Sequence, residues 1–225
     1  KPRDVAGKVI DMLFPPGTQS RIPIAAITGT NGKTTTSRML AHIMKSSGKI
    51  VGMTSTDGVY VDGKLTVKGD MTGPASAQMV LRDPSVDFAV METARGGLVR
   101  SGLGYQRCDV SACLNVTSDH LDRHGTVAAY RAVKRRLAEL APADGVVVLN
   151  DEDGVSRAYA DAGPARVVRY TRGAPPPGGV GIADGWIVAD RVERLAAIGG
   201  GTAMTGPRGR VLPLDTIPIP GEHNH

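Results

Sequence analysis

From residue 22 onward, short apolar runs alternate with longer segments in which apolar residues recur every three or four positions. The short runs predict β-strands and the longer segments predict amphipathic α-helices. Strands that are apolar throughout and alternate with helices indicate an α/β fold, in which helices cover both faces of a mostly parallel sheet. Functional residues are then expected at the carboxyl ends of the strands. We predict strands at 24–28, 50–54, 88–92, 110–115, 146–150 and 167–170, and helices at 34–47, 75–81, 127–141 and 155–162.

Two stretches interrupt this alternation. Residues 54–70 contain two Asp-Gly pairs around a short apolar run, a pattern typical of a hairpin insertion. Residues 172–220 are rich in Gly and Pro and predict a small antiparallel β annex, with strands at 180–182, 186–188 and 211–214. Residues 1–21 are interpreted as a short helix and linker from a preceding domain, and residues 22–225 as one domain.

Composition narrows the possible partners. Hydrophobic residues make up 41% and charged residues 22%, as in ordinary globular proteins, but aromatic residues only 4%. Few aromatic platforms argue against a single-stranded nucleic-acid binder, and the basic residues are scattered apart from Lys134, Arg135 and Arg136. The net charge of +5 favours anionic ligands. Two cysteines without metal-like spacing, and no signal peptide or membrane-length apolar run, predict a reduced, cytoplasmic protein with no membrane partner.

A glycine-rich loop between the first predicted strand and helix carries the strongest chemical signal. Its residues are Gly29, Thr30, Asn31, Gly32, Lys33, Thr34 and Thr35. Such a turn presents backbone N–H groups at a helix N-terminus, which forms a cradle for phosphate. Lys33 adds a cation for the β- and γ-phosphates, and the Thr34 hydroxyl is a Mg²⁺ ligand in loops of this kind. The first glycine of the usual P-loop is replaced by Ile27, so this is a shorter form of the loop.

Three later residues add candidate chemistry. Glu92 ends an apolar strand, where a carboxylate is well placed to bind Mg²⁺. His120 lies in a loop with two aspartates, an arginine and a second histidine, and is a candidate ligand for a second metal; the simpler interpretation is a capping loop with Thr126 as the N-cap. Lys134 lies inside the predicted helix 127–141 and, from helix propensity alone, is interpreted as a solvated lysine.

The order of these motifs resembles the central ATP-binding domain of the Mur ligase superfamily from about residue 22 to the end of the chain. Within that superfamily the sequence is most similar to the cyanophycin synthetase family, through Asp11–Gly17, Arg21–Ile24, Met53–Val61 and Glu92–Gly104. The shared motifs are GTNGKTTT, ETARGG, NVTSDHLDRHGT, YRAVKRRL, VVVLNDED and PGEHN.

The resemblance implies a role for each matching residue, with ATP and Mg²⁺ as cofactors. Lys33 would hold the transferred phosphate, Thr34 and Glu92 the first Mg²⁺, and His120 a second metal. Lys134 matches a lysine that several Mur ligases carry as a carbamate, an anionic metal ligand. The resemblance further implies nucleotide contacts by His223 and Asn224, and contacts to an acidic acceptor by Thr72, Arg95 and Arg100.

The implied function is an ATP-dependent amide ligase that works through an acyl phosphate and adds arginine to the aspartate side chains of a polyaspartate backbone. Its partners would be an amino acid and an acidic peptide or polymer, and the full-length enzyme is expected to be a homo-oligomer. Residues 122–126 look more like a peptidoglycan-precursor or folylpolyglutamate ligase, which is the first alternative. The second is a non-catalytic ATP-binding module. No ATP-grasp or C-terminal ligase domain accompanies the sequence, so we expect the isolated chain to be inactive.

Overall fold

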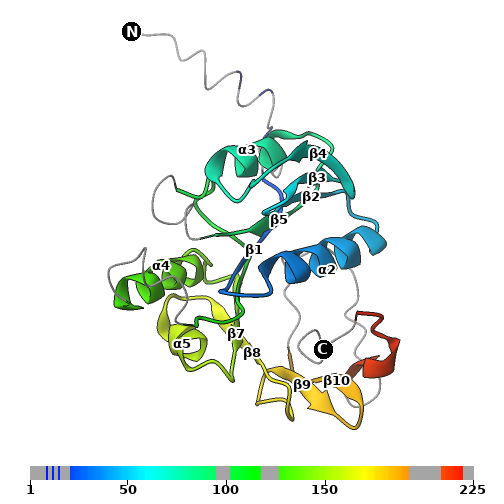
Figure 1. Cartoon of the computed structure of the whole chain (residues 1–225), viewed down its shortest axis with the longest axis vertical. Helices are drawn as coiled ribbons and strands as arrows, with labels where there is room; N and C mark the ends of the chain where they lie inside the picture. Colours follow the sequence, from blue (N-terminus) through cyan, green and yellow to red (C-terminus); the bar gives the residue numbers. More distant parts are fainter. Residues whose placement is uncertain are drawn as a thin grey trace.

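The computed structural model describes residues 21–94, 102–117, 127–192 and 209–219, together with Val9, Met12 and Pro15. Val9 and Met12 are helical, whereas the rest of the helix predicted near the N-terminus lies outside the described residues. Helices surround a long twisted sheet (Figure 1). Among the described residues, none of the helices combines the length and the apolar composition needed to cross a bilayer.

The first half of the described chain supplies one side of the sheet. Its strands are β1 (Ile24–Thr28), β2 (Val51–Thr54), β3 (Gly58–Val61), β4 (Lys64–Lys68) and β5 (Phe88–Glu92), and its helices are α2 (Lys33–Ser46) and α3 (Pro74–Arg82). β1, β5 and β2 run parallel, and β3 and β4 continue from β2 as an antiparallel hairpin. The hairpin predicted over 54–70 is therefore present and extends the main sheet.

The second half supplies the other side. Its elements are β6 (Val110–Cys113), α4 (Val127–Glu139), β7 (Val146–Asn150), α5 (Gly154–Arg157), the 3₁₀ turn η3 (Ala158–Asp161), β8 (Arg166–Tyr170), β9 (Val180–Ala183), β10 (Trp186–Ala189), β11 (Arg210–Pro213) and the 3₁₀ turn η5 (Leu214–Thr216). β6, β7 and β8 are parallel, and β9, β10 and β11 form the predicted antiparallel annex. The residue pair Tyr170 and Val180 joins β8 to β9, so the annex belongs to the same sheet. The strand order of this sheet is β11-β10-β9-β8-β7-β6-β1-β5-β2-β3-β4.

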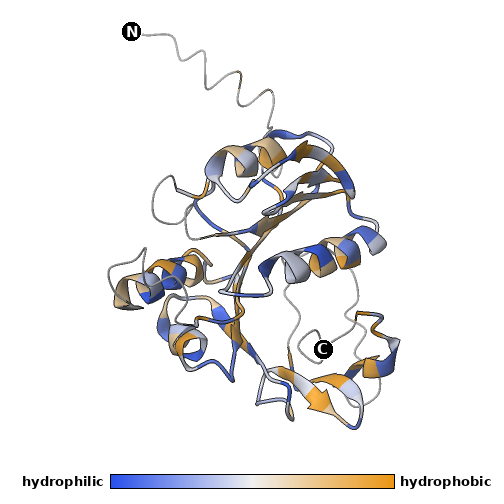
Figure 2. Ribbon diagram, viewed as in Figure 1, coloured by the Kyte–Doolittle hydropathy of each residue, from blue (hydrophilic) through white to orange (hydrophobic). Residues whose placement is uncertain are grey.

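Alternate residues of β1 face two separate cores, because successive side chains of a strand point to opposite faces. Ala25 and Ile27 pack with residues of α2, whereas Ile24 and Ala26 pack with residues of α3 and α4. Both cores are apolar, and hydrophobic residues follow the central strands (Figure 2). Helices on both faces of a mostly parallel sheet confirm the predicted fold class.

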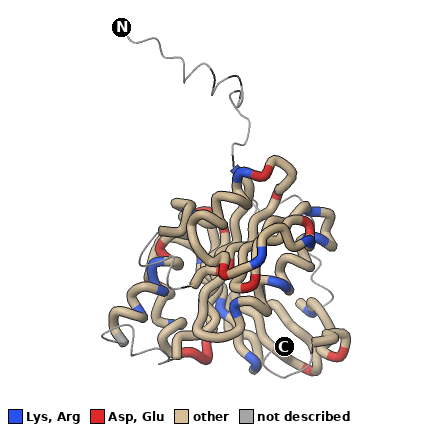
Figure 3. The backbone as a smooth tube through the Cα atoms, turned by 45° about the horizontal axis from the view of Figure 1, so that its top comes forward, with Lys and Arg blue, Asp and Glu red and all other residues tan. Residues whose placement is uncertain are grey.

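The charged residues of the described chain lie mainly at the periphery, where Lys and Arg are interspersed with Asp and Glu over several elements (Figure 3). Two of the predicted site residues depart from that rule. Glu92 and Lys134 are only 2% and 3% exposed. Because burying a charge without a partner is costly, such residues indicate a functional site.

Candidate nucleotide and metal site

The candidate site lies where three central parallel strands end side by side. Ile27 pairs with Glu92 across β1 and β5, and Thr28 pairs with Cys113 across β1 and β6. The glycine-rich loop follows β1 and leads directly into α2, as predicted. The segments after β5 and β6 therefore flank this loop on its two sides.

Two positions of the loop favour glycine, each for a different structural reason. Gly29 is closely covered: a Cβ atom there would lie 3.0 Å from Leu114 Cβ and 3.1 Å from the Asn31 carbonyl oxygen. Gly32, at the N-cap of α2, has a φ of 82°, a left-handed conformation that disfavours other residues. Together they let the backbone reverse tightly before α2 begins at Lys33.

Lys33 is held by its own loop. Its Nζ donates a hydrogen bond to the Thr30 carbonyl oxygen over 2.9 Å, so the ammonium group lies over the turn that it follows. The Gly32 carbonyl oxygen accepts from the Thr36 amide at 2.9 Å, which forms the first turn of α2. This arrangement places a cation and a helix N-terminus together, the combination that binds phosphate.

Glu92 and Thr34 form the second part of the site. The Thr34 hydroxyl donates to Glu92 Oε1 over 3.1 Å, and the Thr56 amide donates to Glu92 Oε2 over 3.3 Å. Burial raises the pKa of Glu92, although the hydrogen bonds from Thr34 and Thr56 and the nearby Lys33 partly oppose that rise. A buried carboxylate beside a hydroxyl, with incomplete charge compensation, is a donor set that suits Mg²⁺.

Thr56 is a site residue that the sequence interpretation missed. Its hydroxyl lies 3.2 Å from Thr34 Oγ1, and since the single proton of Thr34 is directed to Glu92, Thr56 donates in this pair. Thr56 follows β2, the parallel neighbour of β5. Glu92 was selected because it is a polar residue at the carboxyl end of a parallel strand. The same rule would have selected Thr56, had residues 54–70 not been interpreted as a hairpin insertion.

Asp57 fixes the turn that carries Thr56. It accepts hydrogen bonds from Ser55 and Tyr60 and forms an ion pair with Arg38 of α2. The Ser55 hydrogen bond contributes most to lowering the pKa of Asp57, and the Tyr60 hydrogen bond and the positive charge of Arg38 add to it against the opposing effect of burial. The turn is therefore tied to the helix that begins at the nucleotide loop.

Lys134 is buried on the inner face of α4, so its interpretation as a solvated helical lysine is wrong. Its helix neighbours on that face, Tyr130, Leu137 and Ala138, are also buried, and its Nζ lies 5.0 Å from the centroid of the Tyr130 ring. Burial is the main cause of the low pKa of Lys134; Cys113 opposes the shift and Lys33 adds to it, and the resulting pKa is about 8. The Tyr130 hydroxyl lies 3.2 Å from Thr30 Oγ1, so Lys134 lies near the loop.

The other predicted site residues are less well defined. Thr72 bonds to Asp70 through its amide and hydroxyl, and no hydrogen bond of the described chain joins it to the loop or to Glu92. Its neighbour Met71 donates to the Ser55 carbonyl oxygen over 3.0 Å, which places Thr72 close to the Thr56 turn. Arg95, Arg100, His120, His223 and Asn224 lie outside the described residues. Within the described part of the chain, no three His, Cys, Asp or Glu side chains form a metal-binding group.

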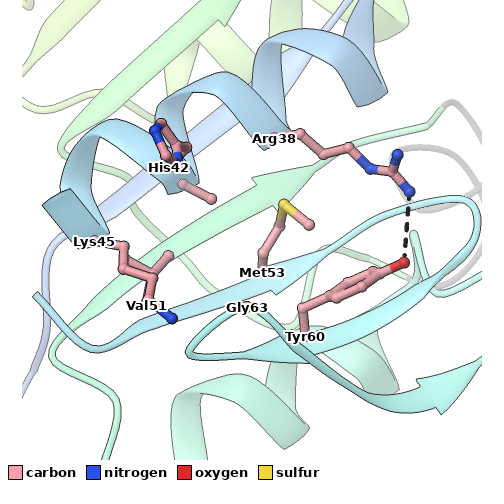
Figure 4. Close-up of a pocket in the computed structure, with 8 residues that line it drawn as sticks. Arg38, His42, Lys45, Val51, Met53, Tyr60 and Gly63 are labelled. Atoms are coloured by element: carbon pink, nitrogen blue, oxygen red, sulfur yellow. Dashed lines mark hydrogen bonds between the residues drawn. The ribbon is translucent and has the colours of Figure 1, made fainter.

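A cavity of about 250 Å³ lies away from these strand ends, between α2 and strands β2 and β3 (Figure 4). Two of its cations are already paired: Arg38 with Asp57, and Lys45 with Asp62. Arg38 also donates to the Tyr60 hydroxyl over 3.5 Å. None of the predicted site residues that the structure describes lines this cavity, whose walls are Arg38, Ala41, His42, Lys45, Val51, Met53, Tyr60 and Gly63.

Comparison with known proteins gives a consistent result. Residues 27–225 match the Mur ligase middle domain family. The chain is 51% identical over 178 residues to a cyanophycin synthetase of Synechocystis sp., which covers 78% of this chain and 20% of that protein. It is 32% identical over 205 residues to a UDP-N-acetylmuramoylalanine–D-glutamate ligase of Thermoanaerobacter sp., covering 91% and 38%. The chain thus spans about a fifth of the length of the cyanophycin synthetases that it matches.

Solved structures share the fold at lower identity. A UDP-N-acetylmuramoyl-L-alanyl-D-glutamate–2,6-diaminopimelate ligase is 24% identical with a TM-score of 0.63, covering 79% of this chain and 37% of that one. A Mycobacterium tuberculosis folylpolyglutamate synthase complexed with ADP and AMPPCP is 23% identical with a TM-score of 0.56, covering 81% and 50%. At these identities the likeness concerns the fold.

Proposed function

This chain belongs to the Mur ligase middle domain family, and we propose that it is the ATP-binding domain of an ATP-dependent amide ligase. The geometric observation that carries the proposal is the placement of Thr34, Glu92 and Thr56 beside the glycine-rich loop. This placement combines a phosphate cradle with an oxygen-rich cation site. The 51% identity to a cyanophycin synthetase supports a finer proposal, in which arginine is joined to aspartate side chains of a polyaspartate backbone.

The chain's own residues would hold ATP and Mg²⁺ as follows. The amides at the start of α2 and the Lys33 ammonium group would bind the phosphates. Thr34, Glu92 and Thr56 would provide oxygen ligands for Mg²⁺. Bound Mg²⁺ would supply charge neutralisation on the phosphates.

The reaction consistent with this site transfers the γ-phosphoryl group of ATP to a substrate carboxylate and releases ADP. An amine then attacks the acyl carbon, an amide bond forms, and inorganic phosphate leaves. Phosphoryl transfer requires little covalent chemistry from the protein, so Lys33 and the loop amides contribute positioning and charge stabilisation.

Lys134 is proposed to act in its carbamylated form. The low pKa that burial gives to Lys134 supports this, because a larger fraction of the amine is then neutral and able to attack CO₂ at neutral pH. His120 is proposed as a ligand of a second metal, and His223 and Asn224 as nucleotide contacts. Thr72, Arg95 and Arg100 are proposed to contact an acidic acceptor, which the net charge of +5 would also favour.

The proposal is tested with the full-length polypeptide and three classes of acceptor. Aspartate–arginine primers, UDP-muramoyl peptides and folates are each supplied with ATP, Mg²⁺ and candidate amino acids, and phosphate release is measured. We expect release only with the aspartate–arginine primer and arginine. Release with muramoyl peptides or folates would replace the substrate assignment, and tight ATP binding with background release for all acceptors would replace the ligase by a non-catalytic module.

A further inference from the structure

The first half of the nucleotide loop is held by Asn115, the second residue after β6. Its side-chain Oδ1 accepts hydrogen bonds from the Thr30 amide at 3.0 Å and from the Asn31 amide at 2.9 Å. Its Nδ2 donates to the Asn31 carbonyl oxygen over 3.2 Å. We propose that Asn115 is a positioning residue that fixes this half of the loop so that the other half can bind phosphate. The inference rests on the proposed function, because it assumes that the loop binds ATP.

A carboxamide is well suited to this position. Its oxygen has two lone pairs for the two amides, and its nitrogen donates to the Asn31 carbonyl oxygen. Aspartate would keep the acceptors but lose the donor and add a negative charge beside a phosphate site. Alanine would remove all three side-chain hydrogen bonds, leaving the Asn31 amide without this partner, whereas the Thr30 amide would keep its bond to the Asn115 carbonyl oxygen at 2.9 Å.

The contacts of Asn115 divide the amides of the loop into two groups. The amides of Thr30 and Asn31 are occupied by Asn115, and Gly32 then turns the chain with its positive φ. The amides of residues 32–35 donate no hydrogen bond to another described residue. They are the unpaired donors at the start of a helix, which makes them the phosphate-binding group. Asn115 thus determines which amides face the nucleotide.

A second contact anchors the same half of the loop. Thr30 Oγ1 accepts a hydrogen bond from the Thr117 amide at 3.1 Å and lies 3.2 Å from the Tyr130 hydroxyl. Tyr130 belongs to α4, one helical turn from Lys134. The loop is therefore held against both the segment after β6 and the helix that carries Lys134, so its position depends on these two elements.

The test compares Asn115→Ala with Tyr130→Phe, which removes one hydroxyl and keeps the ring. Ser156→Ala is the matched control, because the Ser156 hydroxyl also bonds to the end of β6, through the Cys113 carbonyl oxygen at 2.8 Å, but does not contact the loop. The dissociation constant for ATP is measured with Mg²⁺ on the full-length enzyme. KM values for ATP and for the acceptor are measured on the full-length enzyme.

We expect Asn115→Ala to raise the ATP dissociation constant and the KM for ATP about tenfold, and Tyr130→Phe about threefold, since each hydrogen bond contributes on the order of 1 kcal/mol. The KM for the acceptor is expected to stay unchanged, as is ATP affinity in Ser156→Ala. An ATP affinity of Asn115→Ala within about twofold of wild type, or an equal loss in Ser156→Ala, would overturn the inference. If Asn115→Ala does not fold, the Tyr130→Phe result decides. A wild-type full-length enzyme without ATP binding would instead overturn the proposed function, and the inference with it.

Discussion

Thr34 and Glu92 are 58 residues apart in the sequence, yet the Thr34 hydroxyl donates to Glu92 Oε1 over 3.1 Å. This hydrogen bond links the first turn of α2 to the end of β5. It brings the loop that is proposed to bind phosphate next to the buried carboxylate that is proposed to bind Mg²⁺. The pair therefore defines the centre of the candidate site.

Replacing Glu92 with Gln should stabilise the chain in the absence of nucleotide and metal. Burial raises the pKa of Glu92 above its ordinary value of 4.5, so the folded state binds this proton more tightly than the unfolded state. The contribution of Glu92 to stability is therefore greatest below pH 4.5 and falls as the pH rises through the folded-state pKa. Thermal unfolding between pH 4 and pH 8 should show a higher midpoint for Glu92→Gln at neutral pH and a smaller decline with pH. A lower midpoint at pH 7 would contradict this prediction.

In the full-length enzyme, Lys33→Ala should abolish ATP-dependent phosphate release, with a loss of at least about a hundredfold, because the variant lacks the cation that is proposed to hold the transferred phosphate. Its unfolding midpoint should stay close to that of wild type, since the Lys33 side chain is only half-buried and, among the described residues, its Nζ bonds only to the Thr30 carbonyl oxygen. Lys64→Ala, at an exposed position on β4, is the control and should retain activity. Near-normal release by Lys33→Ala would exclude the assigned role.

The pH dependence of stability should reveal the buried amine of Lys134. Burial lowers its pKa to about 8 from an ordinary value of 10.5, so between these values the unfolded state binds more protons than the folded state. Stability should therefore rise with pH over this range, and the cost of the charged amine should be fully present below about pH 8. Urea unfolding in CO₂-free buffer should show this rise in wild type and a flatter profile in Lys134→Met, which should also be more stable at pH 7. Identical slopes would show that Lys134 does not titrate in this range.

Gly52→Ala should destabilise the fold by about 2 kcal/mol through overpacking. A Cβ atom at position 52 would lie 2.4 Å from Val80 Cγ1 and 3.0 Å from Val86 Cγ1, in the core between β2 and α3. Gly73→Ala is the matched control, because no atom lies within 4 Å of its added Cβ and its φ is −103°. Chemical unfolding measures both, and equal stability of the two variants would contradict the packing argument.

The strands could be predicted well because their signal is local. The predicted ranges 24–28, 88–92 and 146–150 coincide with β1, β5 and β7, which are continuous apolar runs. The helix predicted at 155–162 is instead the short α5 followed by a 3₁₀ turn. A segment of this length forms a helix only weakly by itself, so tertiary contacts such as the buried Tyr159 determine its geometry.

The site could be predicted only in part. The loop and Glu92 were recognisable because each follows an apolar strand. The burial of Lys134 was not predicted from helix propensity, because it depends on which face of α4 packs against β6 and β1. Asn115 and Thr56 contact partners that are distant in the sequence. Asn115 bonds to Thr30, 85 residues away, and Thr56 bonds to Glu92, 36 residues away. Their contacts require knowledge of the strand order.

The position of β1 between β5 and β6 has a consequence for folding. The nucleotide loop lies near the start of the described chain, but the residues that hold it come much later in the sequence. Glu92, which bonds to Thr34, is 58 residues away from it, and Asn115 is 85 residues away from Thr30. Contacts of such sequence separation form late and slow the folding of a domain. During synthesis the loop can therefore acquire its shape only after about half of the chain has emerged and the central strands have paired. Nucleotide affinity should appear late in refolding, together with completion of the central sheet.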